Sequence, residues 1–258
     1  IAHISTFGLC GFPYVGADVG GFKNDPSPRL LLRWFQAAAW TNPFFREHSI
    51  IDSKSREPYL YDEPIHTAIR NRYKLLPLFY TAARKSNLTG MPIVRPLWTE
   101  YPDFPKIHSI QNQVLVADSL VVCPVVSLDD DTRGSLDVYP FPGLHYDFFS
   151  GMEVPSKKLT VDIQENIPVF IIGGKIFLTF SHIGSTVNET YSKPLTLHVA
   201  FDENDHADGE AYFDDGHSFN FLQGEYFQKQ YSFHNGILSM RSISRFRQRI
   251  PSYIKNLY

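Results

Sequence analysis

The chain lacks several features that would place it in a special class of protein. It has two cysteines in 258 residues, too few for a disulfide framework. No apolar run reaches the roughly 18 to 20 residues that a membrane-spanning helix needs. The net charge is −3, and no basic cluster indicates a nucleic-acid partner. These absences predict a globular protein with no membrane span and no nucleic-acid partner.

The usual signatures of metal and cofactor sites are also missing. The ten histidines do not occur at zinc-binding spacings, and no glycine-rich loop is followed by Lys-Ser or Lys-Thr. Asp129–Asp131 lacks the alternating pattern of a calcium loop, which favours a solvated turn. We therefore expect no metal and no cofactor. Cys10 and Cys123 lie in apolar contexts, which favours two buried free thiols over a disulfide.

Aromatic residues are abundant, with 21 Phe and 14 Tyr, enough for β-sheet cores and sugar-stacking surfaces. The most informative segment is Gly11–Phe22 (GFPYVGADVGGF). Phe12–Val15 has the pattern of a buried strand, Asp18 follows it, and two glycines permit a sharp turn. A carboxylate just past a buried strand is typical of the active-site end of a β/α barrel. Spacing alone favours the simpler interpretation, a strand-end turn whose Asp18 caps the next helix.

A second strand end, Asn42–His48 (NPFFREH), follows a predicted helix over 25–39. Asp25 or Ser27 can cap that helix, with proline in its first turn. Strand, helix and strand make a βα repeat that places Asp18 and His48 at equivalent ends. The residues expected on the inward helical face are Leu30, Leu31, Trp34, Ala37 and Ala38, so we interpret Trp34 as a core residue.

Four motifs occur in order: GADVGGF (16–22), RWFQAAAWTNPFFREH (33–48), RYKLLPLFY (72–80) and VRPLW (94–98). In these motifs the chain resembles family 31 of the glycoside hydrolases, the retaining α-glucosidases and their relatives. The resemblance implies that the nucleophile and the acid/base lie upstream of Ile1. The chain is therefore expected to be a C-terminal fragment that supplies pocket residues but is inactive by itself.

The resemblance also assigns the site residues. Asp18 corresponds to the pocket floor, Phe22 to the aromatic wall beside the sugar, and His48 to the histidine that bonds sugar hydroxyls in the first subsite. Arg46 is expected to support the pocket as an ion-pair partner. The alternative for His48 is a hydrogen-bonded histidine of the core. Glu47 is expected to point to the opposite side of the backbone from His48.

In the rest of the chain the sequence pattern changes from one that predicts helix to one that predicts β-strands. A helix is predicted over 63–88, kinked at Pro77 and ended by Gly90, and the pair Asp214-Asp215 before Gly216 predicts a hairpin turn. We expect the last part of a (β/α)8 barrel over 1–90, a proximal β-sandwich over 91–184 and a truncated distal β-domain over 185–258. The predicted strands are 1–7, 12–15, 43–45, 93–98, 114–126, 136–139, 145–149, 159–163, 169–180, 195–201, 210–213, 225–234, 237–243 and 250–258.

Location and substrate are read from two further features. Asn87 and Asn188 are the first residues of N-x-Thr triplets, and both lie in polar stretches that we predict to be surface loops. They are therefore candidates for N-glycosylation. VRPLW and Glu210–Phe221 resemble the N-glycan-processing branch of the family. That branch implies an α-glucoside or glucosylated N-glycan substrate, a regulatory β subunit and the endoplasmic reticulum lumen. Two alternatives stay open: a non-catalytic carbohydrate-binding or interaction module, and a family 31 enzyme of other specificity, such as an α-xylosidase or a maltase.

Overall fold

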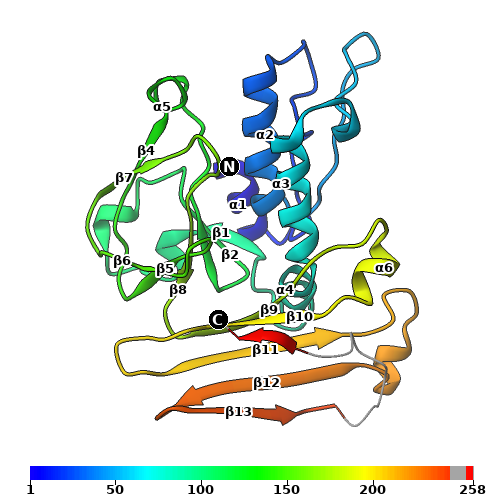
Figure 1. Cartoon of the computed structure of the whole chain (residues 1–258), viewed down its shortest axis with the longest axis vertical. Coiled ribbons are helices and arrows are strands. Elements are labelled where there is room, and N and C mark those ends of the chain that lie inside the picture. The colour runs from blue at the N-terminus through cyan, green and yellow to red at the C-terminus, as the bar shows by residue number, and fades with distance from the viewer. Residues whose placement is uncertain (245–253, 258) are drawn as a thin grey trace. The chain divides into compact units, whose positions relative to one another are not determined.

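The computed structural model describes residues 1–244 and 254–257, and it divides into two compact units (Figure 1). The first unit comprises Ile1–Arg72, Gly90–Pro142 and Pro155–Phe170. The second comprises Tyr73–Thr89, Gly143–Val154 and Ile171–Tyr258. Helices dominate the early part of the chain and strands the later part, so the mixed α/β and all-β character is confirmed. The division into domains at 90 and 184 stays a prediction.

The chain begins with a helix where a strand was expected. Helix α1 (Ala2–Leu9) buries Ile4 and Gly8, one turn apart, and contacts strand β1 (Val94–Pro96). A Cβ on Gly8 would lie 2.8 Å from the Val94 carbonyl oxygen, so glycine permits this close approach. The strand prediction for 1–7 is wrong because a short apolar run does not by itself distinguish a strand from a buried helix face.

The expected barrel strands at 12–15 and 43–45 are extended segments without regular strand structure, and Phe12 and Tyr14 are exposed. The segments nevertheless run side by side and in parallel. The Phe44 N–H donates to the Val15 carbonyl at 3.2 Å, and Val19 forms a single parallel bridge with Glu47. A β-ladder needs repeated residue pairs, so a single bridge does not make these segments β-strands.

Helix α2 (Pro28–Thr41) begins as the sequence predicts. Ser27 caps it through the Leu30 N–H, and Pro28 occupies its first position. Its buried face includes Leu31, Phe35 and Ala38. Leu30, expected on this face, is 51 % exposed, because the inward stripe is rotated by one residue. Trp34 is half-buried.

The predicted long helix is two helices, α3 (Glu63–Lys74) and α4 (Leu76–Thr89), separated at Leu75. Pro77 in the first turn of α4 removes an N–H that a continuous helix would use, which confirms the expected interruption. Asn87 is exposed but lies in the last turn of α4, and Asn188 lies in the short helix α6 (Val187–Tyr191). Both asparagines were expected in loops, and both lie on helices.

The 3-10 helices are η1 (Pro58–Leu60), η2 (Leu97–Thr99), η3 (Pro105–Ile107) and η4 (Asn220–Gln223).

In the first unit β1, β2 (Val114–Val116) and β3 (Leu120–Val122) form an antiparallel meander with fully buried β2 and β3. Strand β8 (Val169–Ile172) follows β3 in the sheet order. Strands β4 (Ser135–Val138) and β7 (Leu159–Asp162) form a separate pair. Cys123 is buried and Cys10 is exposed, and both are free. The expectation of two buried thiols is therefore wrong for Cys10, which follows the last residue of α1.

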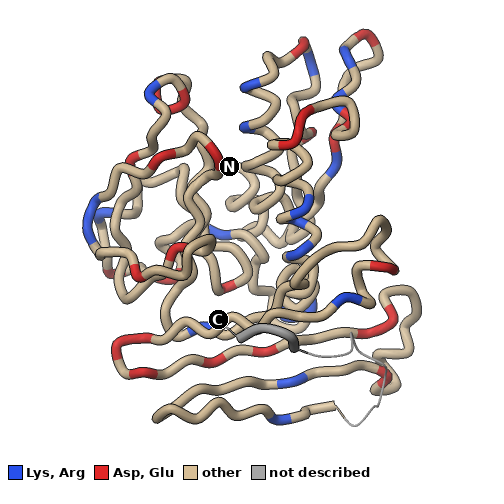
Figure 2. Tube along the Cα trace, viewed as in Figure 1, with Lys and Arg blue, Asp and Glu red and all other residues tan. Residues whose placement is uncertain are grey.

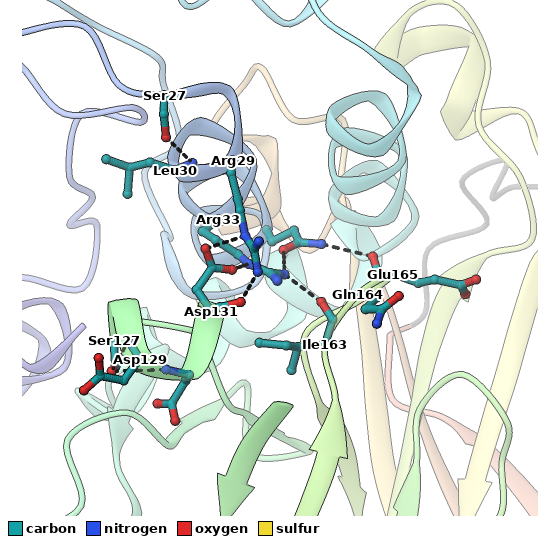
Figure 3. A network of polar contacts seen from close by, with 12 residues as sticks. Ser27, Arg29, Leu30, Arg33, Ser127, Asp129, Asp131, Ile163, Gln164 and Glu165 are labelled. Atoms are coloured by element: carbon teal, nitrogen blue, oxygen red, sulfur yellow. Dashed lines mark hydrogen bonds and ion pairs between the residues drawn. The ribbon is translucent and has the colours of Figure 1, made fainter. Parts of the chain in front are cut away.

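The Asp-rich segment is a short helix, α5 (Leu128–Arg133), capped by Ser127, and not a solvated turn. Its Asp131 accepts from Arg33 Nε at 2.7 Å and pairs with Arg29 Nε at 2.6 Å (Figure 3). Arg33 Nη1 also donates to the Ile163 carbonyl at 2.8 Å. Partial burial would raise the pKa of Asp131, but the hydrogen bonds from Arg33 and Arg29 hold it below its usual value. This network ties α2 to the strand region of the first unit.

The second unit is built on a six-stranded sheet in the order β13-β12-β11-β9-β10-β14. Strands β11, β12 and β13 run side by side in Figure 1. Helix α4 packs on β9 and β11. Strands β5 (His145–Asp147) and β6 (Glu153–Val154) are antiparallel partners and end the sheet order β1-β2-β3-β8-β5-β6. Figure 2 shows basic and acidic residues interspersed along the described strands. The sheet strands are β9 (Lys175–Phe180), β10 (Leu195–Ala200), β11 (Ala207–Phe213), β12 (Phe227–His234), β13 (Ile237–Ser242) and β14 (Ile254–Leu257).

Strands β11 and β12 are antiparallel, but the tight turn expected at Asp214-Asp215-Gly216 is wrong. Phe213 pairs with Phe227, so a long loop joins the strands. Asp214 is held by Tyr80 and by Tyr212, whose hydroxyl donates to Oδ2 at 2.8 Å. These bonds tie the Asp214 carboxylate to α4 and to the end of β11. The predicted strand over 250–258 contains β14, and its residues 250–253 and 258 lie outside the described part.

Candidate functional site

Two segments of the first unit, Val15–Phe22 and Phe44–His48, carry the predicted site residues side by side. The Val19 N–H donates to the Arg46 carbonyl at 3.1 Å, and the Ile50 N–H donates to the Phe22 carbonyl at 2.8 Å. These bonds fix the register of the segments. Asp18 therefore lies beside Arg46, and Phe22 lies beside His48.

Asp18 and Arg46 form an ion pair. Arg46 Nη2 lies 3.3 Å from Asp18 Oδ1, and the side chains are 53 % and 30 % exposed. Such a half-exposed pair holds the carboxylate in place at a small gain in stability. The Arg46 contacts go to Oδ1, and a carboxylate has a second oxygen that can accept hydrogen bonds from hydroxyl groups.

The rings of Phe22 and His48 lie 5.5 Å apart between centroids, with their planes at 34°. Phe22 is 42 % exposed, and His48 is exposed. An exposed histidine is not the hydrogen-bonded core residue of the alternative interpretation. A neutral imidazole offers one donor and one acceptor, and the neighbouring phenyl ring offers an apolar face. Together they can bind a ligand that carries hydroxyl groups on an apolar ring.

One residue of this region escaped the sequence analysis. Arg56 is fully buried, with 0 % exposure, and its guanidinium donates to the carbonyls of Gly20, Asn24 and Lys54. Gly20 has φ +93°, and a Cβ there would lie 2.3 Å from Arg56 Cδ. The signal in the sequence that could have revealed Arg56 is the glycine pair Gly20-Gly21, because glycine allows another side chain to approach the backbone closely.

Glu47 directly precedes His48, and its carboxyl group responds to the neighbouring Glu57 carboxyl. Partial burial, followed by the contact with Glu57, raises the pKa of Glu47. These two carboxyl groups therefore adjoin the segment that carries His48.

The arrangement can bind and orient a polyhydroxylated ligand: it offers a carboxylate, an imidazole and an aromatic face at one end of two parallel segments. Among residues 1–244 and 254–257, no three His, Cys, Asp or Glu side chains are placed to hold a metal ion. No helix in the same part of the chain has the length and apolar character for crossing a membrane.

Comparison with known proteins gives two family matches. The profile of the glycosyl hydrolases family 31 TIM-barrel domain matches residues 1–82. The profile of the glycosyl hydrolase family 31 C-terminal domain matches residues 90–177. Together they cover well over half of the chain. The candidate site lies entirely within the first match.

Individual relatives agree with these matches. The glucosidase 2 subunit alpha of Saccharomyces cerevisiae is 34% identical over 269 aligned positions, which cover 100% of this chain and 27% of the relative. A probable glucan 1,3-alpha-glucosidase of Arabidopsis thaliana is 37% identical and covers 98% of this chain. The chain spans about a quarter of the length of these relatives.

Solved structures show the same similarity in three dimensions. A crystal structure of a glucosidase II alpha subunit bound to Glc1Man2 has a TM-score of 0.87 and 34% identity, covering 95% of this chain and 27% of that one. A heterodimeric complex of the catalytic subunit of ER glucosidase II with the binding domain of its regulatory subunit has a TM-score of 0.87 and 33% identity, covering 98% of this chain.

Proposed function

The chain belongs to family 31 of the glycosyl hydrolases, and we propose that it forms the C-terminal part of a retaining α-glucosidase that removes terminal α-linked glucose. Membership confirms the resemblance of the four motifs, and the glucosidase II relatives confirm the more specific resemblance to its catalytic α subunit. The observation that carries the proposal is the Phe22–His48 pair beside the Asp18 carboxylate.

In this proposal the chain binds glucose and does not break the bond. Asp18 accepts hydrogen bonds from sugar hydroxyls, His48 exchanges hydrogen bonds with further hydroxyls, and Phe22 covers one face of the ring. Arg46 keeps the Asp18 carboxylate oriented. Retaining hydrolysis needs a nucleophile and an acid/base about 5 to 5.5 Å apart, and we propose that another part of the protein supplies both.

We further propose a glucosylated N-glycan as the natural substrate, a regulatory β subunit as partner and the endoplasmic reticulum lumen as the location. Support comes from the S. cerevisiae glucosidase 2 subunit alpha and from an ER glucosidase II catalytic subunit that was solved with the binding domain of its regulatory subunit. Asn87 and Asn188 are exposed, and we propose them as glycan acceptors in that compartment.

The test uses a chimera in which residues 1–258 replace the matching segment of the S. cerevisiae glucosidase 2 subunit alpha. We expect the chimera to hydrolyse a chromogenic α-glucoside with retention, and the isolated chain to show no turnover. A folded but inactive chimera, with the same result when the A. thaliana relative is the host, contradicts the proposal. Hydrolysis of an α-xyloside in place of the α-glucoside would assign another specificity within the family.

A further inference from the structure

Arg56 is the largest fully buried side chain among the described residues. A buried guanidinium usually pairs with a carboxylate, because an unpaired buried charge is costly. The hydrogen bonds of Arg56 go instead to main-chain carbonyls: Nε to Gly20 at 3.2 Å, Nη1 to Lys54 at 3.3 Å, and Nη2 to Asn24. The planar fork of donors therefore holds backbone in place.

Two of these carbonyls stand on either side of Phe22. Gly20 and Asn24 both have positive φ, +93° and +61°, so the segment between them is a tight turn in a conformation that most residues avoid. The guanidinium binds both ends of this turn. Arg56 therefore holds the stretch of backbone that carries the Phe22 side chain, and its guanidinium does so through hydrogen bonds to main-chain oxygens.

Arg56 also faces the second segment of the site. Its main-chain N–H acts to lower the pKa of the carboxyl group of Glu47, the residue that precedes His48. Glu47 is itself bridged to Val19 across the two parallel segments. Arg56 thus binds the Phe22 turn through its side chain, and its main chain faces the segment that carries His48.

We propose that Arg56 is a positioning residue that sets the separation and tilt of the Phe22–His48 pair. The inference rests on the proposed function, in which this pair binds glucose. Loss of the guanidinium fork frees the Gly20–Asn24 turn, so that Phe22 and His48 no longer share one sugar-binding face. Lysine preserves the charge, but its ammonium is a point donor that does not span two carbonyls as the fork does.

The kinetic test is a double-mutant cycle in the yeast chimera. Arg56→Lys should lower kcat/KM about tenfold when His48 is present, the loss expected when a positioned group moves by a fraction of an ångström. In a His48→Ala background the same substitution should change kcat/KM less than about twofold, because Arg56 acts through the pair. An equal loss in both backgrounds would overturn the proposal.

Arg95→Lys is the matched control. Arg95 is 3 % exposed in the same unit and is paired with Glu100 and Asp118, away from the two site segments. Its replacement should lower the melting temperature, and its effect on kcat/KM should be the same with and without His48. If Arg56 had only a structural role, the effect of Arg56→Lys on kcat/KM would likewise be the same with and without His48. The proposal therefore requires that the effect depend on His48 for Arg56→Lys and not for Arg95→Lys.

A second readout does not depend on activity. In the 258-residue chain, Arg56→Lys should accelerate amide hydrogen exchange at Gly21 and Ile50, whose N–H groups bind the Asp18 and Phe22 carbonyls, while α2 keeps its protection. Unchanged exchange at both amides overturns the positioning role. If the unmodified chimera is folded but inactive, the proposed function fails, and the exchange result alone decides the role of Arg56.

Discussion

The rings of Phe22 and His48, which come from two adjacent extended segments, lie 5.5 Å apart and tilted by 34°. Main-chain hydrogen bonds on both sides of the pair hold the segments in register, from Val19 to Arg46 and from Ile50 to Phe22. The pair is therefore a property of the backbone arrangement, and both rings remain accessible to a ligand.

Replacing the aromatic ring of Phe22 tests its role as one wall of the sugar site. Phe22→Leu retains an apolar side chain but loses the flat face, so we expect a several-fold rise in KM for an α-glucoside, equivalent to about 1 kcal/mol. Steady-state kinetics on the yeast chimera measure this. Phe219→Leu, at an exposed phenylalanine of the second unit, is the control and should leave KM unchanged. A similar KM for both variants would remove Phe22 from the site.

The Asp18–Arg46 ion pair should contribute little to stability. Both side chains are partly exposed, so solvent screens their attraction, and Arg46→Gln should cost less than about 1 kcal/mol of unfolding free energy. Urea denaturation at low and high salt measures the cost, which should shrink as salt rises. A cost of several kcal/mol, independent of salt, would show that the pair is a structural element of the core.

Asp131→Asn should be much more destabilising. Arg33 is 8 % exposed and loses its carboxylate partner in this variant, and breaking such a buried pair costs about 3 kcal/mol. Asp130→Asn is the control within the same helix, because Asp130 pairs with the half-exposed Arg133 and should cost under about 1 kcal/mol. Equal unfolding free energies for the two variants would contradict the network in Figure 3.

His198 should make the second unit less stable in acid. Its ring stacks on Phe177 at 4.7 Å between centroids, and burial lowers the pKa of His198 from 6.5 to about 4. The folded form favours the neutral ring, so its contribution to stability is complete above pH 6.5 and is lost as the pH falls towards 4. After allowance for partial exposure, the loss is about 2 kcal/mol.

Denaturation curves across this pH range, for the chain and for His198→Phe, measure the effect. The variant should lose less stability than the unmodified chain between pH 6.5 and 4. Parallel pH profiles for the two proteins would show that His198 does not titrate in this window.

The sequence predicted the elements whose signals are local. Ser27 and Pro28 mark the start of α2, Pro77 marks the interruption before α4, and short apolar runs between turn residues mark strands of both units. The motifs predicted Asp18 and His48 at equivalent strand ends. The structure places the two segments that carry them side by side, without regular strands.

Features that depend on distant contacts were not predictable in this way. Helix α1 forms because Ile4 and Gly8 have β1 to pack against, which a short apolar run does not reveal. Asp131 was read as solvated because its partners, Arg29 and Arg33, are about a hundred residues away in the sequence. Arg56 lies in a polar stretch, and only the fold shows that it is buried.

The central claim is that this chain supplies the glucose-binding side of an α-glucosidase pocket, and His48 tests it most directly. In the yeast chimera, His48→Ala should lower kcat/KM about tenfold through loss of a hydrogen bond to a sugar hydroxyl, with the melting temperature unchanged. His182→Ala, at an exposed histidine of the second unit, is the matched control and should retain full activity. Equal kcat/KM values for the folded His48→Ala and His182→Ala chimeras would contradict the account.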